Sequence, residues 1–187
     1  MRVLRLPVLA VLAAAALVAG TAGTALASPV SGSPARSCVV QLQPDSSARQ
    51  STACFDSLAA AVRHATADTV HIPPGSNTLT QTQLDGGNRS TTAKRSSRII
   101  GIEYVDTDFR GASKVYNVNA APCNAGGSYR DGDLSDDPFN DEISSARSYE
   151  GCTSTHYQHS GFGGWKRSCG CSSMGWMNDR TSSIRWS

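Results

Sequence analysis

Residues 140–145 read Asn-Asp-Glu-Ile-Ser-Ser, and residues 178–183 read Asn-Asp-Arg-Thr-Ser-Ser. Both stretches have the pattern N-D-x-x-S-S, and each is followed by a residue pair in which arginine is second. Each is also preceded by the pattern Y-x-x-x-x-F-x-G, at residues 104–111 in the first instance and 157–164 in the second. Two motifs that recur in the same order indicate an internal duplication.

The duplicated copies span about residues 98–149 and 151–187. Their aromatic-glycine pattern is typical of a strand that bends into a hairpin, because glycine supplies a backbone conformation that other residues resist and the ring covers the bend. Short strand patterns without a helical pattern continue through each copy, four strands to a copy. This part of the chain is therefore predicted to form two packed antiparallel sheets.

The N-D-x-x-S-S stretches offer carboxylate, amide and hydroxyl groups, all of which are hard oxygen donors. Close together on a loop, with main-chain carbonyls between them, they suit a cation that takes six to eight oxygens at about 2.3–2.6 Å. Calcium fits better than zinc or copper because neither stretch contains histidine or cysteine. For one stretch alone, turn capping by Asn, Asp and Ser is an equal alternative, and the duplication argues against it.

With both motifs present twice, about the last ninety residues resemble the βγ-crystallin superfamily. Its Greek-key repeats carry Y/F/W-x4-Y/F-x-G and, in microbial members, N/D-N/D-x-x-S/T-S. The resemblance implies a βγ-crystallin-like Greek-key β-sandwich at residues 98–187. Together with the small α/β segment that the residue pattern predicts before it, the chain is expected to be mainly β. The resemblance also implies that the two loops lie side by side and exchange calcium ligands.

The resemblance assigns the ligands of two calcium sites by position. They are the side chains of Asp141, Ser144, Asp179 and Ser182 and the main-chain carbonyls of Glu142 and Arg180. Since only a carbonyl is needed from the third motif position, a glutamate and an arginine there are equally acceptable. Asn140 and Asn178 are expected to brace the loops rather than to contact the ion.

A second calcium pattern overlaps the first copy. The matches to positions 1, 3, 5, 7 and 12 of an EF-hand loop are Asp131, Asp133, Ser135, Asp137 and Glu142. Position 6 is Asp136, where the sharp turn needs glycine, and Pro138 follows without a helical pattern. We therefore interpret this run as a solvated acidic loop beside the first site rather than as an EF-hand.

Residues 1–27 are expected to be a secretory signal peptide, with a basic start, an apolar stretch and an A-x-A site that ends at Ala27. Loss of Arg2 and Arg5 lowers the formal charge from +2 to about zero. A neutral chain gives no electrostatic reason to bind nucleic acid or a membrane surface. We expect a secreted monomer.

Residues 28–97 are expected to form a small N-terminal segment and a polar linker. Strands are predicted at 39–42 and 70–72, around a helix that begins at residue 58 after a cap at Asp56 or Ser57. The following stretch to residue 97 is rich in Ser, Thr, Gln, Asn and Gly, which is typical of a linker or loose loop.

An even number of cysteines in a secreted chain favours disulfides. The six are Cys38, Cys54, Cys123, Cys152, Cys169 and Cys171. The first two precede the duplication and are expected to pair. A bridge within the last pair would need neighbouring side chains of an extended strand to meet, although they point to opposite faces. The middle two are therefore expected to join the last two, in either order.

The sequence favours a calcium-binding protein whose ions stabilise the fold outside the cell. A secreted metalloproteinase inhibitor or killer-toxin-like protein of the same fold is the alternative. In either case the expected partners include calcium ions and an extracellular protease or a cell-wall component. No nucleophile elbow is present and no cysteine is expected to be free, so an enzyme is not predicted.

Overall fold

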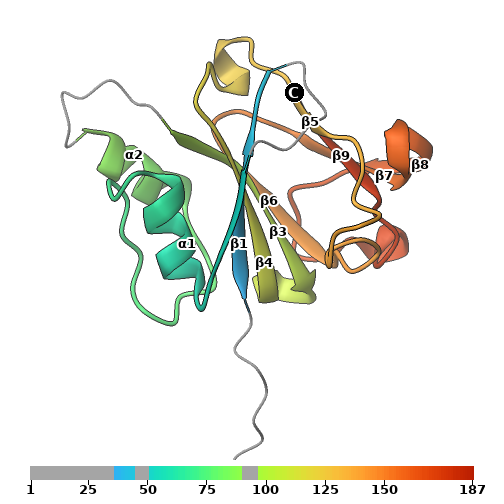
Figure 1. Ribbon diagram of the computed structural model, residues 1–187, viewed down its shortest axis with the longest axis horizontal. Helices are drawn as coiled ribbons and strands as arrows, with labels where there is room; N and C mark the ends of the chain where they lie inside the picture. Colours follow the sequence, from blue (N-terminus) through green and yellow to red (C-terminus); the bar gives the residue numbers. More distant parts are fainter. Residues whose placement is uncertain (1–35, 45–50, 90–96) are drawn as a thin grey trace, which may run out of the picture. The chain divides into compact units, whose positions relative to one another are not determined.

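The computed structural model describes residues 36–44, 51–89 and 97–187 (Figure 1). The predicted signal peptide lies outside these residues. Among the described residues, no helix has the length and hydropathy needed to cross a bilayer. Two sheets dominate the structure, which confirms the mainly β prediction.

The first sheet joins strands from both parts of the chain (Figure 1). Its order is β2 (Ser51–Phe55), β1 (Ser37–Leu42), β4 (Arg110–Val118), β3 (Arg98–Asp106) and β6 (Ser145–Ser148). Strand β1 runs parallel to β4, whereas the other neighbours are antiparallel. The N-terminal segment thus extends a sheet of the duplicated region.

The second sheet is antiparallel throughout. Its order is β5 (Tyr129–Asp131), β9 (Ser183–Trp186), β7 (Ser154–His159) and β8 (Gly163–Ser168). Strand β8 forms one of its edges and pairs only with β7 among the described strands. Short 3-10 helices η2 (Cys123–Ala125) and η4 (Gly175–Met177) lie in the connections.

Each copy of the duplication forms a Greek key that spans both sheets. In the first copy, β3 and β4 form a hairpin, β5 joins the other sheet, and β6 returns beside β3. In the second copy, β7 and β8 form the hairpin and β9 returns beside β7. The stretch near Cys171 lies along β6, because the Ala146 amide donates to the Cys171 carbonyl at 3.0 Å. The predicted Greek-key sandwich is confirmed.

The two aromatic-glycine hairpins have nearly the same backbone. A 3-10 turn closes each one, η1 (Thr107–Phe109) and η3 (Ser160–Phe162), and the phenylalanine has a φ of 62° or 66°. Gly111 and Gly164 follow with φ of 78° and 74°. A Cβ at Gly111 would lie 2.6 Å from a carboxylate oxygen of Asp106, so both the space and the conformation require glycine there.

The first sheet is buried on both faces. On one face, Val39, Ile102 and Val115 pack with the helices α1 (Leu58–Ala65) and α2 (Gln81–Arg89). On the other face, Val40 and Tyr116 pack with residues of the second sheet that include Trp186. Successive side chains of a strand point to opposite faces, so β1, β3 and β4 each contribute to two cores. The arrangement has three layers (Figure 1).

Within the N-terminal segment, Ser57 caps α1 as predicted, because its hydroxyl accepts from the Ala60 amide at 3.3 Å. The predicted strand at residues 70–72 is wrong: Val70 and Ile72 are buried against α1 without joining a sheet. The expected linker also contains α2, which is anchored by buried Leu84. A single buried leucine in a polar sequence gives little helical periodicity.

The disulfides correct one prediction and confirm another. Cys38 pairs with Cys54, directly across the register of β1 and β2. The remaining bridges are Cys123–Cys152 and Cys169–Cys171, so the expected links between those pairs are wrong. Strand β8 ends at Ser168, and the chain bends at Cys171 and Ser172. The Cα atoms of Cys169 and Cys171 are therefore 5.2 Å apart, closer than the roughly 6.6 Å that two residues span in an extended strand. Alternation was also wrongly applied to this pair, because residues two positions apart lie on the same face of a strand.

Candidate metal centre

The two N-D-x-x-S-S loops lie side by side. One immediately precedes β6 and the other precedes β9. The Asp141 amide donates to the Thr181 carbonyl at 3.1 Å, and the Asp179 amide donates to the Ile143 carbonyl at 3.2 Å. These two bonds are equivalent under exchange of the repeats, so the loops form a symmetric pair.

The side chains of the loops also cross from one repeat to the other. The Ser144 hydroxyl donates to a carboxylate oxygen of Asp179 at 3.0 Å, and the Ser182 hydroxyl donates to a carboxylate oxygen of Asp141 at 3.3 Å. Each aspartate is exposed at its loop, whereas both serines are buried. Each candidate centre thus combines a carboxylate from one repeat with a hydroxyl from the other.

The asparagines hold the aspartates in place. Asn140 donates to the second carboxylate oxygen of Asp141 at 3.0 Å, and Asn178 does the same to Asp179 at 2.6 Å. Both aspartates have positive φ, 54° and 53°, a conformation that aspartate tolerates better than most residues. The bracing role predicted for the asparagines agrees with this arrangement.

The last serine of each motif joins the loop to its hairpin. The Ser145 hydroxyl donates to the Asp106 carbonyl at 2.6 Å and accepts from the Phe109 amide at 3.1 Å. Ser183 makes the same two bonds, to the His159 carbonyl at 2.7 Å and from the Phe162 amide at 3.1 Å. The two sequence motifs recur together because they are parts of one hydrogen-bonded unit.

The oxygen atoms available in the loops suit a hard divalent cation. Asn140 Oδ1 and Thr181 Oγ1 are buried and have no hydrogen-bond partner among the described atoms. The side chains of Glu142 and Arg180 are exposed. The main-chain carbonyls of these two residues can therefore serve as ligands whatever the chemistry of the side chains. No cluster of three or more His, Cys, Asp or Glu occurs among the described residues, so hydroxyl and carbonyl oxygens have to supply most of the coordination.

The acidic run that precedes the first loop is only partly solvated, which corrects the sequence interpretation. Buried Lys114 forms an ion pair with Asp137 and lies 3.8 Å from a carboxylate oxygen of Asp131. The Tyr116 hydroxyl donates to the same Asp131 oxygen at 3.0 Å. Sequence analysis missed this cluster because a lysine in an alternating strand gives no sign that it faces a core.

A second buried pair lies between the two sheets. Glu103 Oε2 and His156 Nε2 are 2.9 Å apart, and both side chains are fully buried. Each residue stands immediately before the tyrosine of its repeat, so the pair joins equivalent positions of β3 and β7. Sequence analysis missed the contact, although the equivalent positions within the duplication carry the signal.

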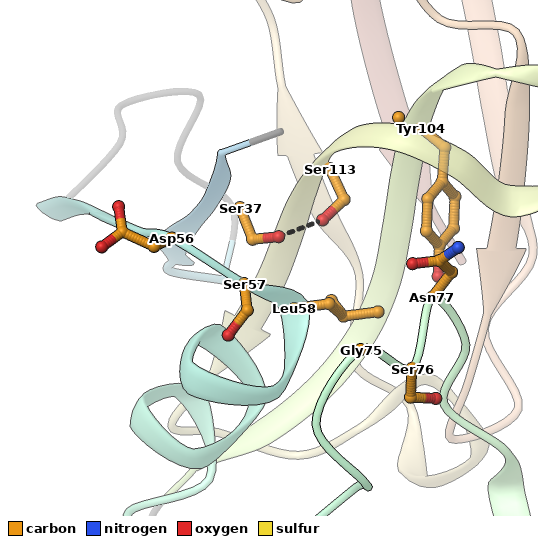
Figure 2. A pocket seen from close by; sticks show the side chains of 10 residues that line it. Ser37, Asp56, Ser57, Leu58, Gly75, Ser76, Asn77, Tyr104 and Ser113 are labelled. Atoms are coloured by element: carbon orange, nitrogen blue, oxygen red, sulfur yellow. Dashed lines mark hydrogen bonds between the residues drawn. The ribbon is translucent and has the colours of Figure 1, made fainter. Parts of the chain in front are cut away.

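A cavity of about 170 Å³ is separate from the loops and lies where the N-terminal segment meets β3 and β4. The Ser37 and Ser113 hydroxyls in its wall are 2.7 Å apart (Figure 2). Tyr104 also lines the cavity, and its buried hydroxyl has no partner among the described atoms. Burial raises the pKa of Tyr104, so its hydroxyl remains a neutral donor.

No protein-family model and no curated protein matches the sequence. Solved structures do show similarity. The N-terminal domain of protein S is 25% identical, with a TM-score of 0.37, over 47% of this chain and 94% of that one. βγ-Crystallin domains from Flavobacterium johnsoniae and Clostridium beijerinckii are 28% and 23% identical, with TM-scores of 0.33 and 0.35. They cover 47% and 46% of this chain and 93% and 95% of their own.

The matches extend to an archaeal βγ-crystallin and to a structure that concerns the eye-lens βγ-crystallin domain fold. All of these structures are βγ-crystallin domains. Over about half of its length, this chain is similar to βγ-crystallin domains, the superfamily that its two motifs resemble.

Proposed function

We propose that this chain is an extracellular protein that binds two calcium ions between its paired N-D-x-x-S-S loops and is stabilised by them. The observation that carries the proposal is the reciprocal contact of Ser144 with Asp179 and of Ser182 with Asp141. Hydroxyl and carboxylate oxygens converge there from two loops whose backbones are already joined. Ion binding would add a link between the repeats.

One centre would use the side chains of Asp141 and Ser182, and the other those of Asp179 and Ser144. The main-chain carbonyls of Glu142 and Arg180 would add neutral oxygens. The serine hydroxyls now donate to the carboxylates, and they can rotate to present their lone pairs to a cation. When bound, each ion would supply a positive charge beside the exposed carboxylate of its own centre.

Each centre has a single carboxylate, so we expect weak binding, with dissociation constants of about 10⁻⁴–10⁻³ M as in other extracellular calcium modules. At free calcium ten times the dissociation constant, each ion would stabilise the fold by about 1.4 kcal/mol. Calcium at about 1 mM would therefore fill each site to about half at the weak end of this range and to about nine-tenths at the tight end. The predicted signal peptide supports an extracellular location.

Thermal unfolding with EDTA and with calcium tests the proposal. We expect calcium to raise the Tm, Asp141→Ala and Asp179→Ala each to remove part of the rise, and the double variant to remove all of it. Asp136→Ala is the matched control, because this exposed acid lies in the same region but outside both loops. The proposal would be wrong if the folded protein showed no rise, or if the control lost the rise to the same extent.

A further inference from the structure

Two tryptophans lie side by side on the surface of the second repeat. Trp165 is 66% exposed and Trp176 is 51% exposed, and they are the exposed large apolar side chains among the described residues. Their ring centroids are 5.9 Å apart and the rings meet edge to face at 75°. Tryptophan is usually buried to a large extent, so an exposed pair points to a ligand.

The pair lies beside an unpaired sheet edge and an arginine. Trp165 belongs to β8, the edge strand, and Trp176 belongs to η4. Arg167 is two residues beyond Trp165 and thus on the same face of the strand. Arg167 Nη1 donates to the Met174 carbonyl at 2.6 Å, which holds the guanidinium next to the turn that carries Trp176.

The apolar area of the pair is too small for a stable protein interface. A tryptophan side chain has about 150–250 Å² of surface, so the exposed surface of the two rings amounts to roughly 200–300 Å². Each partner of a standard protein complex buries about 800 Å². Their exposed neighbours in the adjacent turn are polar, namely Ser172 and Ser173. The face of an exposed indole ring, with polar groups beside it, matches a sugar ring, which has an apolar face and hydroxyl groups around it.

The charge of the second repeat indicates the kind of sugar. Residues 151–187 contain four basic residues and one acidic residue, which give a formal charge of +3. Residues 98–149 contain five basic and nine acidic residues, which give a formal charge of −4. Arg167 also has a planar fork of donors that matches a carboxylate, sulfate or phosphate group. An anionic ligand would thus be attracted to this repeat and repelled by the other.

We propose that Trp165, Trp176 and Arg167 form a binding surface for an acidic polysaccharide. The indole rings would pack against the apolar faces of sugar rings, and the guanidinium would bind an acidic group on the same or the next sugar. Trp176 lies two residues before the second calcium loop, but none of the three residues is an expected calcium ligand. The proposal therefore does not depend on calcium binding.

Titration calorimetry with polygalacturonate, in EDTA, tests the proposal. Fully methyl-esterified polygalacturonate is the matched polymer without charge, and polyglutamate is a polyanion without sugar rings. We expect measurable binding to polygalacturonate and at least about tenfold weaker binding to both controls. EDTA prevents calcium from bridging polymer and protein, so a failure of the calcium sites would leave this result unchanged.

Substitutions separate stacking from net charge. We expect Trp165→Ala and Trp176→Ala each to weaken binding by about tenfold or more, as for an aromatic anchor, and Arg167→Ala to do the same. Lys166→Ala is the control, since this exposed cation is on the other face of β8. Unchanged circular dichroism and Tm would show that the variants are folded.

Two results would overturn the proposal. The first is the absence of binding to polygalacturonate by the folded wild-type protein. The second is equal binding to polyglutamate together with no loss in the tryptophan variants, which would mean that net charge alone attracts polyanions. Acrylamide quenching gives an independent measurement, because bound polysaccharide should shield the two exposed indoles and leave buried Trp186 unaffected.

Discussion

The two repeats have the same motifs and different surroundings. In the first repeat, the N-terminal segment covers the hairpin, so Tyr104 is 1% exposed and packs in the core that contains α1. The equivalent Tyr157 of the second repeat is 9% exposed and has no such cover. The hairpins themselves are alike, with edge-to-face rings 5.8 Å and 5.5 Å apart. The motif therefore sets the backbone, and the neighbouring elements decide what each position does.

Counting from the motif phenylalanine shows how far equivalent positions have diverged. Lys114 and Arg167 both stand five residues beyond it. Lys114 is buried among carboxylates, whereas Arg167 lies beside the exposed tryptophans and contacts a main-chain carbonyl. Ala112 and Trp165 are likewise equivalent, and only the tryptophan is on an open surface. One repeat uses these positions for stability, and we infer that the other uses them for binding.

The largest expected effect comes from Lys114→Ala. The substitution leaves Asp131 and Asp137 without the buried ammonium group, so we expect the free energy of unfolding to fall by about 3–5 kcal/mol. Arg167→Ala is the matched variant at the equivalent position of the second repeat, and it should lower that free energy by about 1 kcal/mol or less. Urea unfolding of both variants measures the difference, and equal losses would contradict the contrast between the repeats.

The disulfides give a second, smaller contrast. Cys123–Cys152 closes a loop with a sequence separation of 29, and Cys169–Cys171 one with a separation of 2. Chain entropy predicts a loss of about 3–4 kcal/mol when the first bridge is replaced by two serines, and less than about 2 kcal/mol for the second. Thermal unfolding of the two double-serine variants measures these losses. The reverse order would show that the short bridge fixes the stretch that lies along β6.

The sequence predicted those parts of the fold that depend on local pattern. The hairpins follow from motifs in which glycine, serine or asparagine has one backbone task, whereas the adjacency of the loops followed from the family resemblance that these motifs carry. The sequence did not predict that β1 lies parallel to β4, that Lys114 faces two carboxylates, or that Glu103 contacts His156. These contacts join residues that are distant in the chain, and their strength comes from burial, which no local pattern records.

The smallest expected effect concerns the hydroxyl of Tyr104. A buried hydroxyl without a partner lowers stability, so Tyr104→Phe should raise the free energy of unfolding by up to about 1 kcal/mol at neutral pH. Tyr157→Phe, the equivalent change in the open repeat, should leave it within about 0.5 kcal/mol. Urea unfolding of both variants checks this. A loss of stability in Tyr104→Phe would show that the hydroxyl is bonded, through water in the adjoining cavity or otherwise.

Alkaline unfolding sharpens the same comparison. Burial raises the pKa of Tyr104 above its ordinary value near 10, so the unfolded chain loses the phenolic proton at lower pH than the folded chain does. Ionisation of Tyr104 therefore leaves stability unchanged below about pH 10 and lowers it as the pH rises above that value. Tyr104→Phe cannot ionise, so its stability should fall less steeply above pH 10 than that of the wild type. Identical slopes would mean that the phenol ionises equally in both states and that the cover over the first repeat does not exclude water from it.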